Sequence, residues 1–166
     1  MANINDVRAT NNPQRSYEFE VELIGSTVSG SLPLLTQRVE TISIPEVSVE
    51  TFEINYKGRK TIHAGRDSSP HTVSVTFWDS EAHEVYEFFK GWIDRGISDQ
   101  VVGGGVTRDQ YSAEMVIKMM AADSTTVTRE FRLTGVFPTT IGEASLDYTT
   151  SDSKKVEVTF SYETLV

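Results

Sequence analysis

Hydrophobic and polar residues alternate with a period of two along most of the chain, and this pattern predicts a mainly β protein. In the first such segment Tyr17 to Leu23 alternate apolar side chains with Glu18, Glu20 and Glu22, so the three carboxylates form a row on one face. Similar patterns predict further strands over 37–44, 47–56, 59–64, 72–78, 111–120, 126–137 and 155–163, with a short one over 144–148. Pro138 is expected to end the strand that precedes it. The fold class expected from these strands is an antiparallel β sandwich or barrel.

One segment breaks the alternation and has the spacing of an amphipathic helix. Its apolar residues recur three and four positions apart, at Ala82, Val85, Tyr86, Phe89, Trp92 and Ile93. Such spacing places them in one stripe along a helix. We expect this helix over about 79–95, with Asp79 accepting the first free N–H groups and Gly96 ending it. No other segment has a helical pattern.

The strands over 47–56 and 59–64 flank Lys57 and Gly58, and this arrangement predicts a protruding hairpin over 47–64. Its first strand carries Phe52, Ile54 and Tyr56 on one face, which either enter the core of the subunit or need a neighbour to cover them. Its tip is basic, since Lys57, Arg59 and Lys60 lie there. These cations either bind carboxylates of another subunit or keep the tip solvated.

The remaining segments are expected to be irregular parts of a single domain over 1–166. Residues 1–13 are polar and are predicted to be an N-terminal arm. Residues 25–33 are rich in Ser and Gly and read as a loop. Residues 97–110 contain three consecutive glycines and are predicted to be a flexible loop.

The composition excludes several functions. The chain has 166 residues, of which 38% are hydrophobic, which is enough for one core. It has no cysteine, so it forms no disulfide and has no thiolate metal site. A formal net charge of -9 argues against wrapping nucleic acid, which depends on Lys and Arg. No targeting signal and no membrane-spanning run is expected in the sequence.

The sequence offers no convincing active site, and we expect no enzymatic activity, cofactor or bound metal. Three histidines and many serines and aspartates are present, but no motif frames a nucleophile among them. Asp79, Glu81 and His83 could begin a metal site only with a further ligand, such as His63 or His71. Acidic residues that cap a helix are the simpler interpretation.

Three segments, taken in order, resemble a known family. They are 58–65 (GRKTIHAG), 72–92 (from TVSVTF through DSEAH to Trp92) and 127–148 (VTREFRLTGVFPT, IGE and LDY). In this order and spacing, over about the C-terminal two thirds of the chain, they resemble the tail tube proteins of contractile-tailed bacteriophages, the kind that forms the inner tube of T4-like tails. The N-terminal strand and the glycine loop match only in general character.

The resemblance implies a structural subunit with one helix, six copies of which form a ring in which strands continue from subunit to subunit. Stacked rings would form a tube through which DNA leaves the virion without being bound specifically. Sheath, baseplate and tail-terminator proteins are the implied partners, and the tail of the virion, after assembly in the host cytoplasm, is the implied location. Within such a tube Glu18, Glu20 and Glu22 either face the channel or form an ordinary solvated face. A tube component of a related secretion-like or pyocin-like injection machine, or a small acidic binding domain, remains an alternative.

Overall fold

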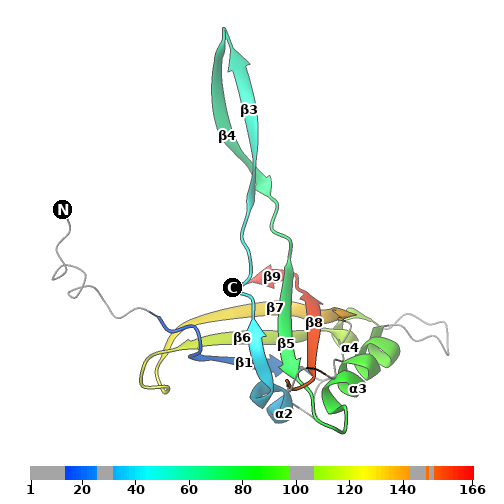
Figure 1. Cartoon of the computed structure of the whole chain (residues 1–166). Helices are drawn as coiled ribbons and strands as arrows, with labels where there is room; N and C mark the ends of the chain where they lie inside the picture. Colours follow the sequence, from blue (N-terminus) through cyan, green and yellow to red (C-terminus); the bar gives the residue numbers. More distant parts are fainter. Residues whose placement is uncertain (1–13, 26–31, 98–106, 143–148, 150–151) are drawn as a thin grey trace, which may run out of the picture.

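The computed structural model describes residues 14–25, 32–97, 107–142, 149 and 152–166, which form a mainly β subunit (Figure 1). The strands are β1 (Phe19–Ile24), β2 (Val39–Ile42), β3 (Val49–Tyr56), β4 (Arg59–Asp67), β5 (Thr72–Trp78), β6 (Ala113–Met120), β7 (Val127–Ile141), β8 (Lys155–Ser161) and β9 (Thr164–Leu165). The helical segments are α2 (Leu32–Gln37), α3 (Glu84–Gly91), the π-helical η2 (Trp92–Ile97) and α4 (Arg108–Tyr111). The expected arm over 1–13, the strand over 144–148 and most of the glycine loop lie outside the described residues.

One sheet, with strand order β1-β6-β7-β8-β5-β2, folds over itself to make the body of the subunit. All of its pairs are antiparallel, as the alternating sequence predicted. β7 belongs to both layers, because its first part pairs with β6 and its last part pairs with β8. In Figure 1 the strands β2, β5 and β8 cross in front of β1, β6 and the first part of β7. We call these the front layer and the back layer.

The core lies between the two layers and is closed at one end by α3. The alternation along each strand decides which side chains enter it, since successive residues of a strand point to opposite faces. Its fully buried members include Val75, Phe77, Phe89, Met115, Leu133, Val158 and Phe160. The Phe89 ring lies 5.2 Å from Phe77 and 5.6 Å from Phe160, so α3 packs directly against the front layer.

The helix expected over 79–95 is present but begins later. Residues 79–83 form a turn, and α3 starts at Glu84 after His83, which has a positive φ of 55°. Asp79 still accepts a hydrogen bond from the Val85 N–H at 3.2 Å, so it caps the helix across this turn. Gly96 does not end the helix, because the chain continues as η2 to Ile97.

Two further expectations are corrected by the structure. The chain has helical turns besides α3: α2 begins at the end of the expected loop over 25–33 and ends at Gln37, and α4 occupies the end of the expected loop over 97–110. Pro33 in the first turn of α2 was a usable signal, because proline suits the start of a helix. Pro138 does not end β7. The register between β7 and β8 shifts between Pro138 and Thr140, and such a bulge tolerates a residue without an N–H. None of the described helices has the length and hydropathy needed to cross a bilayer.

Gly135 lies in β7 beside the point where this strand changes partner from β6 to β8. Its φ is +64°, and a Cβ at this position would collide with the guanidinium of Arg108, which forms an ion pair with Glu163. Gly135→Ala is therefore expected to destabilise the fold by about 1–2 kcal/mol from backbone strain alone. Chemical denaturation measures this loss.

Gly91→Ala is the matched control. A Cβ at Gly91 meets nothing within 4 Å, and the residue lies in α3, where alanine is favoured by up to about 1 kcal/mol. The strain argument is wrong if Gly135→Ala is as stable as the parent protein.

Candidate assembly surface

A two-stranded hairpin, β3 and β4, projects from the body and forms a separate sheet (Figure 1). Every residue of both strands is exposed. An isolated two-stranded hairpin has marginal stability in water, because it lacks a layer to pack against. The hairpin therefore presents a surface that a partner could complete.

The turn at the tip holds the two strands in register. Lys57 and Gly58 both have positive φ values, 47° and 77°, and they join the paired residues Tyr56 and Arg59. Two central residues with positive φ give the turn type whose twist suits a two-residue hairpin. Gly58 adopts this conformation without strain, and its position in the turn explains why the chain reverses there.

The two faces of the hairpin differ in chemistry. Phe52 pairs with His63 and stacks on it with ring centroids 5.4 Å apart, while Ile54 and Tyr56 follow on the same face. These three apolar side chains are 50%, 51% and 69% exposed. The opposite face carries the ion pair of Glu53 with Lys60 together with one large apolar residue, Ile62, which is 61% exposed. We call the side with Phe52, Ile54 and Tyr56 the apolar face.

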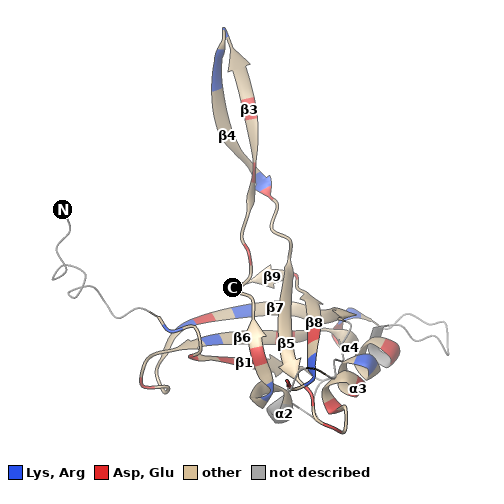
Figure 2. Ribbon diagram, viewed as in Figure 1, with Lys and Arg blue, Asp and Glu red and all other residues tan. Residues whose placement is uncertain are grey.

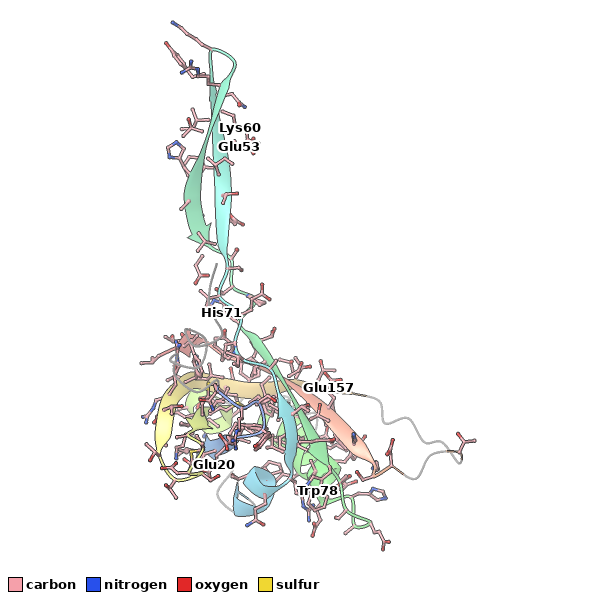
Figure 3. The ribbon with its side chains drawn as sticks, turned by 60° about the vertical axis from the view of Figure 1, so that its left-hand side comes forward. Glu20, Glu53, Lys60, His71, Trp78 and Glu157 are labelled. Atoms are coloured by element: carbon pink, nitrogen blue, oxygen red, sulfur yellow. The ribbon has the colours of Figure 1, made fainter. Side chains whose placement is uncertain are left out.

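The cations predicted for the tip are gathered there, as Figure 2 shows. Lys57 places its Nζ 5.2 Å from the centre of the Tyr56 ring, and Arg59 pairs with Tyr56 across the turn. Lys60 and Glu53 point toward each other on the polar side in Figure 3. The tip thus offers a basic end beside exposed aromatic surface, a combination that suits a partner with an acidic, apolar surface.

The root of the hairpin is fixed by short hydrogen bonds between its two ends. Ser68 donates its N–H to the Ser48 carbonyl at 2.9 Å, and the Ser48 N–H donates to the Ser69 hydroxyl at 3.1 Å. Asp67 accepts bonds from the hydroxyl and the N–H of Ser69, and these bonds lower the pKa of the Asp67 carboxyl. The hairpin is therefore anchored where it leaves the body.

In the predicted acidic row, Glu20 and Glu22 lie on β1, on the outward side of the back layer, whereas Glu18 directly precedes β1 and its side chain is only 7% exposed. Glu22 accepts a bond from Lys118 at 2.7 Å, and this bond raises the pKa of the Lys118 ammonium. Glu18 is paired with Arg15 at 3.4 Å, and Glu20 lies across from Lys118 in the β1 and β6 pair. The carboxylates are thus matched by neighbouring cations in the folded subunit, a feature that the sequence pattern of β1 alone did not reveal.

Within the described residues, β1 and β2 are the terminal strands of the main sheet. Between them lies a groove of about 840 Å³ whose lining includes the side chains of Tyr17, Phe19, Val39, Ile42, Ile44 and Met119. Unpaired strand edges present free N–H and C=O groups, which proteins usually cover. This groove, formed by segments far apart in sequence, was not predicted.

The segment around Asp79 is structural in the described chain. The Asp79 carboxylate is fully buried and accepts bonds from the N–H groups of Ser80 and Val85 and from Lys154 Nζ at 3.3 Å. The Lys154 Nζ also lies 2.8 Å from His83 Nδ1. A cation this close to the ring nitrogen opposes the binding of a metal ion at that atom. Among the described residues no group of three or more metal-ligating side chains converges. The positions of His63 on the hairpin and His71 at the start of β5 fit no common site with Asp79.

Comparison with known proteins identifies the family. A family model for phage tail tube proteins matches residues 8–166, nearly the whole chain. The chain belongs to the phage tail tube protein family. It is 27% identical over 150 residues to tail tube protein gp19 of Enterobacteria phage T6 and 26% identical to that of phage T4, covering 89% of this chain and 86% of each relative. The resemblance expected from the sequence is confirmed.

Solved structures support the same fold for this tail tube protein. The sheath/tube terminator of the extracellular contractile injection system PVC, in its extended state, superposes with a TM-score of 0.68 at 16% identity, over 95% of this chain and 98% of that one. At this identity the likeness concerns the fold only. It confirms the mainly β, antiparallel class.

Proposed function

We propose that this tail tube protein assembles into hexameric rings that stack into the inner tube of a contractile phage tail, through which DNA is ejected. The observation that carries the proposal is the match of a tail tube family model to residues 8–166. The protein acts structurally and without catalysis or a cofactor. Its location is the virion tail, after assembly in the host cytoplasm.

The shape of the subunit supports assembly between unlike surfaces. The exposed hairpin projects away from the body, whereas the open edges of β1 and β2 and the groove between them belong to the body (Figure 1). When a projecting element of one copy meets a different surface of the next, the contact is heterologous and repeats until it closes a ring or extends a filament. Strand edges at β1 and β2 would then be covered by a neighbouring copy.

The hairpin over 47–64 is the proposed contact between subunits. Phe52, Ile54 and Tyr56 provide its apolar contact area, and Lys57, Arg59 and Lys60 provide its charge. The N-terminal arm over 1–13 and the segment over 97–110 are further proposed parts of the single tail tube domain. Sheath, baseplate and tail-terminator proteins are the proposed partners at the outside and the ends of the tube.

The channel wall is proposed to be neutral to acidic, because a wall rich in Lys or Arg would bind phosphates by counterion release and hold the DNA. It stays a prediction that this wall is lined by Glu18, Glu20 and Glu22. Their neighbours Arg15 and Lys118 give a reason to consider another face as well.

A tube component of a contractile injection system is the second candidate. It is favoured by the structural likeness to the PVC terminator, whose system is extracellular and contractile. The two candidates share the tube and differ in cargo. A small acidic binding domain is the third and least supported candidate.

Assembly is tested on the purified protein by sedimentation and electron microscopy. The expected result is sixfold rings or tubes, formed spontaneously or after addition of baseplate components. Monomers at every concentration, even with those components, would contradict the proposal and favour the small binding domain. Detection of DNA inside the tube of assembled particles would identify a phage tail, whereas a different cargo would identify an injection machine.

A further inference from the structure

The two outward faces of the body differ sharply in charge. The outward residues of the back layer include Glu20, Glu22, Lys118, Glu130 and Arg132, which we call the charged face. Two ion pairs run across it, Lys118 with Glu22 at 2.7 Å and Arg132 with Glu130 at 3.1 Å. Figure 2 shows charges along β6 and the first part of β7, whereas β5 has none and the charges of the front layer are those of Glu40, Lys155 and Glu157 on β2 and β8.

Most outward residues of the front layer are hydroxyl side chains, arranged in rows across the strands between the Trp78–Lys155 pair and the hairpin. Residues that pair across antiparallel strands share a face of the sheet. The rows are Thr41 with Thr76 and Glu157, then Ser74 with Thr159 and Thr140, then Thr72 with Ser161 and the one aromatic member, Phe137. We call this set the hydroxyl face. The Ser74 and Thr159 hydroxyl oxygens lie 3.4 Å apart, so the second row is continuous across β5 and β8.

Charge on the hydroxyl face is limited to one carboxylate, Glu157, for which the described residues provide no ion-pair partner. Lys155 pairs with Trp78 next to the row of Thr76 and Glu157, and it is held there by Glu40 at 2.8 Å. The guanidinium of Arg38 lies against the Trp78 ring at the same end of the face. Figure 3 labels Glu157 on the front layer and Glu20 on the back layer, so the acids of the two faces do not share a surface. None of the residues in the three rows is a lysine or an arginine.

A polyanion moves most easily along a surface that offers it many equivalent weak contacts and no strong one. Lys and Arg provide the strong contacts, since each cation that binds a phosphate releases counterions and adds a salt-dependent affinity. Hydroxyl groups donate single neutral hydrogen bonds to phosphate and carry no net charge. The hydroxyl face offers only such weak contacts, whereas the charged face offers strong ones through Lys118 and Arg132.

The front layer is also the layer from which the hairpin extends. β2 leads into β3, and β4 leads into β5, so the strands of the hydroxyl face run toward the element that would join successive copies (Figure 1). A face continued in this direction from copy to copy forms an unbroken wall along the assembly.

We infer that the hydroxyl face lines the channel and is the surface along which the DNA backbone passes, with Glu157 as its repelling group. The charged face, with the acidic row, then lies away from the channel. This inference rests on the proposed function, because it assumes a tube that conducts DNA.

The absence of cysteine in the chain allows a direct test. Thr76→Cys and Ser74→Cys place a thiol on the hydroxyl face, and Glu20→Cys is the matched variant on the charged face. Assembled tubes are treated with a small maleimide and with a maleimide coupled to a bulky protein that cannot enter the tube. The hydroxyl-face thiols are expected to react with the small reagent and not with the bulky one, while Glu20→Cys reacts with both.

A second measurement uses charge. Thr159→Lys tubes are expected to retain short duplex DNA in a nuclease-resistant form, with a log-log salt dependence of about -0.9 per new lysine and phosphate contact. DNA bound by Glu20→Lys tubes is expected to stay nuclease-sensitive.

Each other outcome has a defined meaning. If Glu20→Cys reacts with the small reagent but not with the bulky one, while Thr76→Cys reacts with both, the inference is overturned and the acidic row lies in the channel. Hydroxyl-face thiols that resist both reagents would show an interface between subunits and would also overturn it. Failure of the parent protein to form tubes would instead contradict the proposed function.

Discussion

Replacing Phe52 and Tyr56 with serine is expected to abolish assembly and to leave the folded subunit intact. Both side chains are at least half exposed in the isolated subunit, so their removal costs the monomer little. In an assembled tube they would be buried, and each buried aromatic contributes on the order of 2 kcal/mol. A combined loss of about 4 kcal/mol weakens each contact by roughly three orders of magnitude. Sedimentation measures the assembly, and thermal unfolding of the monomer measures the fold.

Ile62→Ser is the matched control for this experiment. Ile62 is similarly exposed and lies on the same hairpin, but on the side with the ion pair of Glu53 and Lys60. If the apolar face makes the contact, Ile62→Ser assembles far better than the double variant. Loss of the thermal transition in the double variant would show that Phe52 and Tyr56 support the fold, and equal loss of assembly in all variants would show that both faces are covered.

Asp79→Ala is expected to produce the largest loss of stability among single substitutions of polar residues. The Asp79 side chain is fully buried, and its removal leaves Lys154 without its carboxylate and the N–H groups of Ser80 and Val85 without their side-chain acceptor. Breaking a buried charge pair by removing one member costs about 3–5 kcal/mol. For a chain of this size the melting temperature should fall by roughly 10 °C. Chemical denaturation in the Phe52 and Tyr56 double-serine background measures the loss without interference from assembly.

Asp79→Asn separates the cap from the charge. The asparagine Oδ1 can still accept the Val85 N–H, but it no longer neutralises Lys154, so this variant should lie between the parent and Asp79→Ala. If Asp79→Ala unfolds within about 1 kcal/mol of the parent, Asp79 is not the link between α3 and the segment before β8 that the structure indicates.

Much of the β structure was predictable because burial on one side of a strand imposes a period of two. β5 lies over 72–78 as expected, and the alternation placed Val73, Val75 and Phe77 in the core. The turn at Lys57 and Gly58 was equally readable, since few residues adopt positive φ. The helix was recognised from its apolar stripe, but its start was misplaced by five residues, because Asp79 caps it from outside the helix.

The elements that were missed depend on partners distant in sequence. β9 has only two residues and is defined by its pairing with Leu133 and Thr134 of β7. The passage of β7 through Pro138 depends on β8, which supplies the second half of its pairing. No local pattern can show such partners, since the energy that stabilises these segments comes from contacts made after the sheet has folded.

The sequence by itself determined the fold class, the hairpin with its aromatic face and the family, because periodicity, turn residues and motif order are properties of neighbouring residues. Only the tertiary structure decided which charges are matched. It paired Glu22 with Lys118, and it gathered the hydroxyls of β2, β5, β7 and β8 in rows whose one charged member is Glu157. The physical reason is that charge and hydrogen bonding act between side chains that meet in space, and strand order, which local sequence does not encode, determines which ones meet.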